Sequence, residues 1–179
     1  MAMKFLLASC ISAIVTYVFV SISLFTPAWV SAKVSAFGLS AKKSAGIFPW
    51  GCVSANTCSL FWNNADGWAI VLFLSMLFAW IVQFFAVVSI ILAVVIQRYR
   101  CTLTRGFVGK QTLVTILLLF TLIGYGATYD RSAGVYFSIG VTFSLDSSYW
   151  LCLVATIFSI VAMGFGGTTV KQARHCEWR

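Results

Sequence analysis

The chain has 179 residues, of which 61% are apolar and 9% are charged, with a mean hydropathy of +0.98. This composition excludes an ordinary soluble domain. Twelve basic residues against four acidic ones give a net charge of +8. That charge could suggest nucleic acid, but so apolar a chain points to a membrane protein instead, and no nucleic-acid partner is expected.

Four apolar runs are each long enough to cross a hydrocarbon core of about 30 Å, which takes about 20 helical residues. In chain order they are Phe5–Phe25, Trp68–Ile96, Thr112–Tyr129 and Ser148–Gly167. Helices are expected because a lipid-exposed backbone has to satisfy its polar groups internally. The sequence therefore predicts one membrane domain over residues 1–179, an α-helical four-transmembrane bundle, with loops at 26–67, 97–111 and 130–147 and a tail at 168–179.

The first run also resembles a secretory signal peptide. Lys4 precedes it, and the small residues Val30-Ser31-Ala32 follow it. The run is longer than the apolar core of about 7–15 residues that is typical of signal peptides. We therefore expect a retained first helix rather than a cleaved leader.

The basic residues predict which side of the membrane each loop faces. The loop after the second run has four basic residues and no acidic one, whereas the loop after the third run has Arg131 with Asp130 and Asp146. Short loops rich in Lys and Arg stay cytoplasmic. Both termini are therefore expected in the cytoplasm, and the long first loop outside the cell. Anionic lipid head groups are expected to meet the basic residues on the cytoplasmic side.

The cysteines divide in the same way. Cys10 and Cys152 lie in apolar runs, whereas only Cys52 and Cys58 lie on the oxidising side. A disulfide between these two is favoured over free thiols. Zinc is disfavoured because two cysteines without a matching His or Cys pair cannot complete four ligands, and no metal or cofactor is predicted.

Alternating side chains predict strands in the outer loops. Val30–Ala36 alternates apolar and polar residues, and Ile47–Val53 and Cys58–Trp62 flank a plausible turn at Asn56-Thr57. Val135–Leu145 has the longest alternation, with apolar Val135, Phe137, Ile139, Val141 and Phe143. These segments predict a small extracellular antiparallel sheet on the bundle, which could also contact a partner.

Tryptophans gather near the predicted membrane boundaries, as rings with one polar end do. Trp29, Trp50, Trp62, Trp68 and Trp150 are expected to anchor the chain there or to pack on the sheet, and direct contact with a partner is the alternative. Trp80 lies deeper in its run and is expected to pack in the bundle or against lipid.

The sequence contains few residues that could support catalysis or ion-coupled transport. His175 is the single histidine and lies in the tail, and the four apolar runs contain no Asp, Glu, Lys, Arg or His. No enzyme and no catalytic residue are predicted. Gln83 is the main large polar residue in a run, and an interhelical hydrogen bond is favoured over a partner contact or a water cavity.

Small residues recur at helical spacing and allow helices to approach closely. In the fourth run they are Ala155, Ser159, Ala162 and Gly166. Packing inside the bundle is favoured over contact with a partner. Cys101 and Cys176 lie among basic residues near the inner surface, which suits palmitoylation, and two unmodified thiols are the equal alternative.

These residues resemble a known family. Four spans, cytoplasmic ends and a long first outer loop with a Trp and the pattern G-L-W-x-x-C…C are typical of the superfamily of claudins, PMP22 and calcium-channel γ subunits. Trp29 matches the first Trp, Gly46-Ile47-Phe48 takes the place of G-L-W with Trp50 two positions on, and Cys52 and Cys58 match the cysteine pair. The resemblance implies a claudin-like fold and a function exercised through protein contact.

Two kinds of function fit this resemblance. In the first, the chain is an auxiliary or trafficking subunit of an ion channel or receptor. In the second, it is an adhesion or barrier protein at cell–cell contacts, and a similarity in length and layout to a four-pass nematode sperm-surface protein adds gamete recognition. The end of the sequence, Cys176 to Arg179, lacks the hydrophobic C-terminal residue with which many claudins bind PDZ scaffolds, which favours the first. Expected partners are membrane lipids and another membrane protein, and a homo-oligomer is also allowed.

Overall fold

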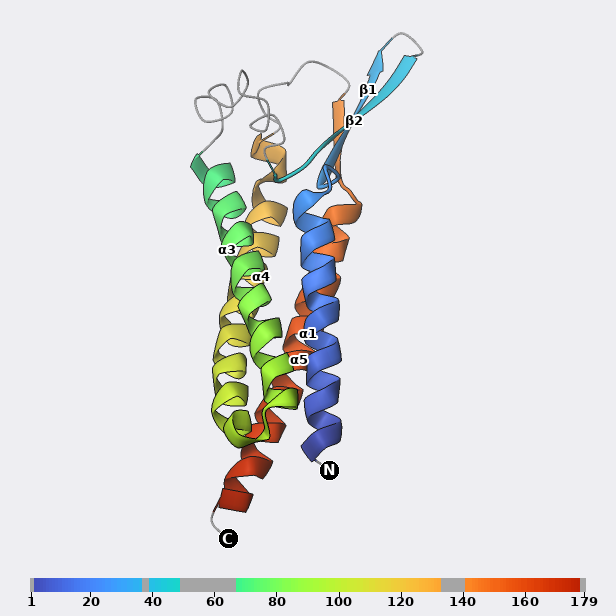
Figure 1. Ribbon diagram of the computed structural model, residues 1–179. Coiled ribbons are helices and arrows are strands. Elements are labelled where there is room, and N and C mark those ends of the chain that lie inside the picture. Colours follow the sequence, from blue (N-terminus) through green and yellow to red (C-terminus); the bar gives the residue numbers. More distant parts are fainter. Residues whose placement is uncertain (1, 37–38, 49–66, 133–140, 178–179) are drawn as a thin grey trace, which may run out of the picture.

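Four long helices form an elongated bundle in the computed structural model, which describes residues 2–36, 39–48, 67–132 and 141–177 (Figure 1). They are α1 (Ala2–Phe25), α3 (Gly67–Val95), α4 (Arg100–Ser132) and α5 (Ser147–Glu177), and the 3-10 turn η2 (Gln97–Tyr99) joins α3 to α4. All four are long and apolar enough to cross a membrane. The chain is thus a multi-pass membrane protein.

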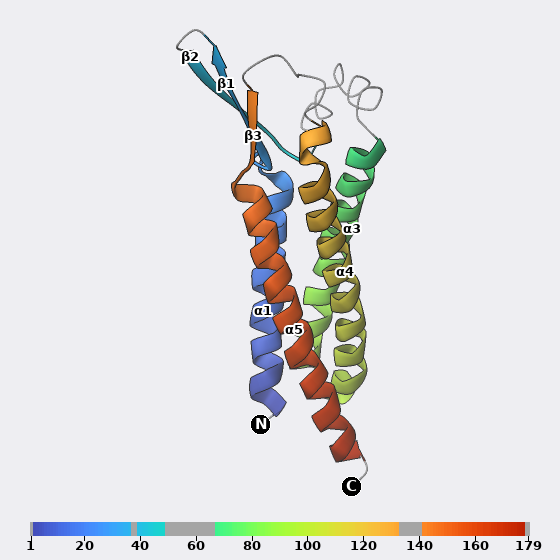
Figure 2. The same cartoon turned by 180° about the vertical axis from the view of Figure 1, so that it is seen from behind.

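Neighbouring helices run in opposite directions. α1 packs chiefly on α5, and α3 packs chiefly on α4 (Figures 1 and 2). α1 begins and α5 ends at the same end of the bundle, and the strands lie at the other end. We call these the terminal end and the sheet end.

The helices extend beyond the apolar runs that predict them. α4 begins at Arg100 rather than at Thr112, so most of the segment expected as a loop over 97–111 is helical. α5 likewise continues to Glu177, through most of the expected tail. Hydropathy marks only the stretch that lipid covers, whereas Arg, Lys and Gln are good helix formers and can continue a helix past that boundary.

One consequence concerns charge within the helices. α4 carries Arg100, Arg105 and Lys110, although the shorter run at 112–129 contains no charged residue. The Lys110 Nζ donates to the Ser89 Oγ of α3 at 2.7 Å. A lysine at this depth keeps a polar partner while its apolar stem lies along the helices.

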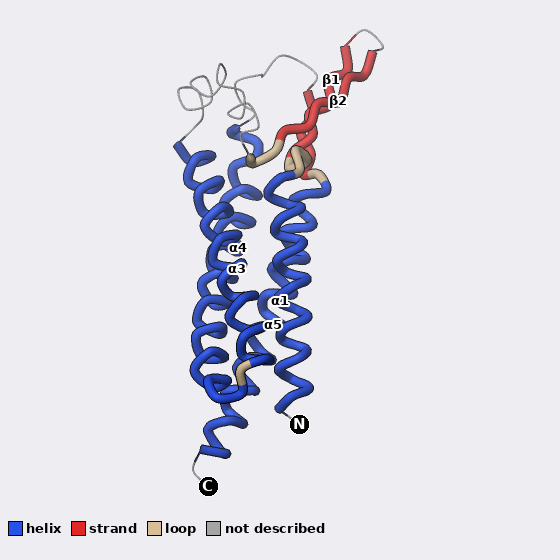
Figure 3. The backbone as a smooth tube through the Cα atoms, viewed as in Figure 1, coloured by secondary structure: helices blue, strands red, loops and turns tan. Residues whose placement is uncertain are grey.

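A small antiparallel sheet stands on the bundle. Its strands are β1 (Val30–Ala36), β2 (Leu39–Ala45) and β3 (Val141–Leu145), in the order β2-β1-β3. Figure 3 shows that strand structure is confined to the sheet end. The predicted strand at 30–36 is confirmed, and β3 forms the last part of the segment 135–145, whose residues 135–140 lie outside the described residues.

The prediction of a strand starting at Ile47 is wrong at its first two residues. Ile47 and Phe48 form a bend, and the strand that pairs with β1 lies earlier, at Leu39–Ala45. Ile47 is buried and Phe48 packs against the apolar core, so these side chains leave the sheet for the bundle. The rest of that segment, and Cys58–Trp62, lie outside the described residues.

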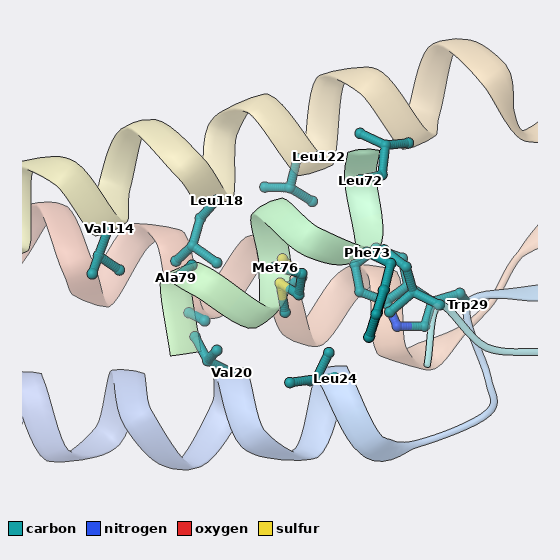
Figure 4. Close-up of a cluster of buried hydrophobic side chains, with 13 residues drawn as sticks. Val20, Leu24, Trp29, Leu72, Phe73, Met76, Ala79, Val114, Leu118 and Leu122 are labelled. Atoms are coloured by element: carbon teal, nitrogen blue, oxygen red, sulfur yellow. The ribbon is translucent and has the colours of Figure 1, made fainter. Parts of the chain in front are cut away.

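The buried apolar side chains form two clusters along the bundle. The upper cluster, near the sheet end, includes Val20, Trp29, Met76 and Leu118 (Figure 4). The lower cluster, near the terminal end, includes Leu6, Ile90, Phe107 and Ala162. The outward faces are apolar as well, which suits helices surrounded by lipid.

Candidate contact site at the sheet end of the bundle

The first strand grows directly out of the first helix. The Thr26 amide donates to the Ile22 carbonyl at 2.9 Å, and Pro27 then stops the helix because it has no N–H to donate. Only Ala28 and Trp29 separate Pro27 from β1. The direction of the strand is therefore set by how this short connection is held.

Trp29 holds that connection in the core. Its indole is fully buried, and the Nε1 donates to the Ser23 carbonyl in the last turn of α1 at 2.7 Å. The ring meets Tyr125 of α4 at a centroid distance of 4.9 Å and Tyr149 of α5 at 6.3 Å, both edge to face. The side chain therefore links three helices, and it is not an anchor at the lipid boundary.

The start of α5 is bound to the same connection. The Ser148 amide donates to the Ala28 carbonyl and the Asp146 amide donates to the Trp29 carbonyl, each at 2.9 Å. The Ser23 Oγ donates to the Ser148 carbonyl at 2.7 Å. The Asp146 Oδ1 accepts from the Ser147 amide at 2.8 Å, which satisfies the first amide of α5. β1 and β3 thus leave the bundle side by side.

The chain returns to this point after β2. A side chain on Gly46 would place its Cβ 2.7 Å from the Pro27 Cα and 3.2 Å from the Thr26 carbonyl oxygen, so only glycine fits. Ile47 is then buried, and the Phe48 ring meets Phe25 at 5.2 Å and Phe73 at 5.8 Å. The residues Gly46-Ile47-Phe48 therefore fasten the second strand to the bundle.

Between these two attachments, β1 and β2 form a hairpin that projects beyond the helix ends (Figures 1 and 2). In its register, Lys33 lies opposite Lys42 and Ala32 lies opposite Lys43. Residues 30–48 contain these three lysines and no acidic residue. The hairpin is therefore a basic element with a rigid base.

The strand β2 was missed by the sequence analysis, although a signal for it exists. Residues 31–36 read SAKVSA and residues 40–45 read SAKKSA, so one short pattern occurs twice around Phe37-Gly38. Two copies of one strand pattern separated by a Gly-containing segment are typical of a hairpin. The adjacent Lys42-Lys43 breaks the alternation, which is why periodicity alone failed.

The remaining predicted sheet residues divide into two groups. In β3, Val141 lies opposite Val34, and Phe143 lies opposite Ala32. The others lie outside the described residues, namely Trp50, Cys52, Cys58, Val135, Phe137 and Ile139. The Cys52–Cys58 disulfide therefore stays a prediction.

The small residues of α5 face the inside of the bundle. Ala155, Ser159 and Ala162 are fully buried, and the Ala162 carbonyl accepts a 2.9 Å hydrogen bond from the Ser9 Oγ of α1. A Cβ on Gly166 would lie 3.0 Å from Phe107 and from Val108 of α4. Gln83 is also fully buried, and its Nε2 donates to the Ala13 carbonyl at 2.9 Å.

The other aromatic residues and cysteines lie at varied depths. Trp68 and Trp150 are 41% and 55% exposed near the sheet end, as interface residues are, whereas the Trp80 Nε1 donates to the Ser21 Oγ inside the bundle at 2.9 Å. Cys101, near the start of α4, is a partly buried free thiol. Cys176 lies in the last turn of α5.

The geometry offers a projecting hairpin as a candidate surface for contact (Figure 1). Within the described ranges, no group of three His, Cys, Asp or Glu side chains could hold a metal ion. The candidate contact feature is a basic hairpin held on the helical bundle by a buried Trp, a glycine and two aromatic contacts.

These features define a class, the four-pass membrane proteins in which the segment after the first helix forms most of a sheet on a helical bundle. A family model described as "Tight junction protein, Claudin-like" matches residues 1–176. The chain belongs to this claudin-like family. A comparison with curated proteins found no match.

Proposed function

We propose that this protein joins cells by contact between membrane surfaces and catalyses no reaction. The observation that carries the proposal is the β1–β2 hairpin, which projects past the helices while its base is fixed to them (Figure 1). Such an element can reach a second surface without losing its shape. The family description, which names tight junction proteins, supports a role of this kind.

The orientation in the proposal follows from charge. Lys4, Arg98, Arg100, Arg105 and Lys171 lie toward the terminal end. Basic residues of short connections remain cytoplasmic, so the termini face the cytoplasm, and the hairpin lies outside the plasma membrane. The lysines of the hairpin do not oppose this orientation, because a long loop is translocated largely regardless of its charge.

The edge strands and the lysines of the hairpin also limit which surfaces it can contact. Among the described strands, β2 and β3 are the edges of the sheet, and an edge can pair with another chain. Lysines on an edge strand oppose indiscriminate pairing. The contact is therefore expected to be selective for a surface with acidic groups, on a neighbouring cell.

A cell-aggregation experiment tests this function. Non-adhesive suspension cells that express the protein are mixed with cells of a second colour, which either express it or do not, and clusters are counted. We expect expressing cells to cluster, and the colour of the clusters tells whether the partner is another copy or a different protein. Cells that display the protein at the surface and stay single would contradict the proposal.

The hairpin's part is tested by a charge reversal with a matched control. The variant K33E/K42E/K43E is expected to abolish clustering at unchanged surface display, because it removes the attraction to acidic groups. The control K33R/K42R/K43R keeps the charge and is expected to cluster. If both variants cluster equally, the hairpin is not the contact element.

A second function, as an auxiliary or trafficking subunit, is favoured by one observation. α3 turns large aromatic side chains outward, with Phe78, Phe84 and Phe85 each about half exposed. Another membrane protein could pack on this face. Purification from native membranes in a mild detergent decides the matter, because a stoichiometric channel or receptor would support this role and isolation of the chain by itself would exclude it.

A further inference from the structure

A layer of buried polar side chains crosses the middle of the bundle, between the upper and lower apolar clusters. Each member is at most 8% exposed, and every helix contributes. The polar layer, as we call it, consists of Ser12, Thr16, Gln83, Gln111, Thr115, Thr156 and Ser159. It plays no part in attaching the sheet.

Hydrogen bonds and the helical rise place the centre of this layer, from Ser12 to Ser159 and Gln111, at about one height. The Gln111 Nε2 donates to the Ser159 Oγ at 2.7 Å, and the same Oγ lies 2.7 Å from the Thr115 Oγ1, which joins α4 to α5. α5 meets α1 where the Ser9 Oγ donates to the Ala162 carbonyl. The two helices are antiparallel, so moving about one turn toward the sheet end leads from Ser9 to Ser12 in α1 and from Ala162 to Ser159 in α5. Ser12 therefore lies level with Ser159.

α3 joins the layer from the other side of α1. The Gln83 Nε2 donates to the carbonyl of Ala13, the residue after Ser12. Gln83 also lies near the level of Gln111. α3 and α4 are antiparallel, and the Ser75 Oγ donates to the Leu117 carbonyl at 3.4 Å; Gln83 and Gln111 lie eight and six residues from this contact, toward the same end of the bundle. The two glutamines therefore belong to the same cross-section of the bundle.

Each glutamine has one end that no side chain or backbone group satisfies. The Gln83 Oε1 and the Gln111 Oε1 are buried and accept no hydrogen bond from the described residues. At Gln83 the assignment of the amide is chemically fixed, because a flipped carboxamide would turn its oxygen toward the Ala13 carbonyl oxygen. At Gln111 a flip would leave the Nε2 unsatisfied instead. A buried polar atom without a partner is costly in a medium without water.

We propose that the polar layer binds water inside the bundle, with water O–H groups donating to the Gln83 Oε1 and the Gln111 Oε1. The free oxygens need a donor, and the layer's members are uncharged amides and hydroxyls, which suit water rather than an ion. Buried water of this kind bridges polar groups that the chain itself leaves unsatisfied. The hydrated layer sits between two dry apolar clusters.

Water-edited solid-state NMR on the full chain in lipid bilayers tests the proposal. The experiment follows the transfer of proton magnetisation from water to nitrogen. We expect the Nε2 signals of Gln83 and Gln111 to build up as quickly as that of Gln97, which is exposed in the turn η2 between α3 and α4. The backbone amides of Met76 and Leu118, in the upper cluster, serve as the dry reference. Build-up at either glutamine as slow as at these amides would overturn the proposal.

A variant separates water held by the glutamines from water that enters through loose packing. In Q83L/Q111L the free oxygens are gone, so transfer to the backbone amides of Thr115 and Ser159 is expected to fall to the rate at Met76. Ser89→Ala, outside the layer, is expected to leave that transfer unchanged. If Q83L/Q111L folds and its transfer to Thr115 and Ser159 stays as fast as in the original protein, the proposal is overturned. If Q83L/Q111L does not fold, the comparison of Gln83 and Gln111 with Met76 and Leu118 in the original protein decides.

Discussion

At the scale of single residues, Trp29 and Gly46 determine how the sheet is attached. Trp29 is fully buried against tyrosines of α4 and α5, and Gly46 lies against the backbone of Pro27 and Thr26. Trp29 fills the space between the helices with a large side chain, whereas Gly46 lets two segments of backbone approach closely because it has no side chain. Both belong to the motif that resembles the claudin pattern, which gives the motif a structural role at the base of the hairpin.

Trp29→Ala is expected to lower the free energy of unfolding by about 3–5 kcal/mol, because it leaves a cavity where three helices meet. Trp150→Ala is the matched control, since Trp150 is 55% exposed, and its loss is expected to be under about 1 kcal/mol. Denaturant titration in mixed micelles measures both. Equal losses would mean that Trp29 does not hold the helices together.

Gly46→Val is expected to destabilise the protein by about 1–3 kcal/mol, because the new side chain meets backbone that cannot move aside. In contrast, a Cβ on Gly164 would meet nothing within 4 Å, so Gly164→Ala is expected to cost nothing and to gain up to about 1 kcal/mol from helix propensity. The same titration compares the pair. A harmless Gly46→Val would show that the close approach to Pro27 is not required.

At the scale of elements, α1 and α5 form the pair that supports the sheet. β1 continues α1 and β3 leads into α5, so the contact between these helices fixes the two strands relative to each other. The helices come close where the small, fully buried Ala162 lies, since its carbonyl accepts the hydrogen bond from the Ser9 Oγ of α1. Hydrogen bonds at Ser9 and Ser23 join the helices near both ends.

Ala162→Leu is expected to destabilise this pair by about 1–3 kcal/mol, since the interface has no room for three more carbon atoms. Val161→Leu is the control, because Val161, the neighbour of Ala162 in sequence, is 37% exposed and faces outward. Thermal unfolding of the purified variants should separate them. If Val161→Leu lowered stability as much as Ala162→Leu, the face of α5 that packs on α1 would be wrongly assigned.

At the scale of the whole molecule, the four helices carry two apolar clusters with a polar layer between them, and the terminal end and the sheet end lie opposite each other (Figure 2). The clusters hold the helices together, and the basic residues near the terminal end are the basis of the proposed orientation in the membrane.

Epitope accessibility in intact cells tests the direction of the molecule. A short tag inserted between β1 and β2 is expected to bind antibody without permeabilisation, because the hairpin lies outside the cell in the proposed orientation. A tag at either terminus is expected to bind only after permeabilisation. Terminal tags that stain intact cells would reverse the orientation and remove the basis for the adhesion test.

Much of the fold follows from local pattern. The alternation at Val30–Ala36 predicts β1 at its observed bounds, and the apolar runs predict where the helices cross the membrane. The beginning of α4 at Arg100 was not predictable from hydropathy, because basic residues extend a helix beyond the lipid that hydropathy measures. β2 was also missed, because its identity as a strand depends on pairing with β1 more than on its own alternation.

The sequence by itself determined the membrane class, the family resemblance and the strand that follows the first helix, because hydropathy, motif spacing and alternation are local properties. Tertiary structure alone decided that Trp29 is a core residue and not a lipid anchor, because that depends on Tyr125 and Tyr149 from distant helices. It likewise decided that Gln83 and Gln111 share one layer. Burial and partners arise only when helices far apart in the sequence pack together.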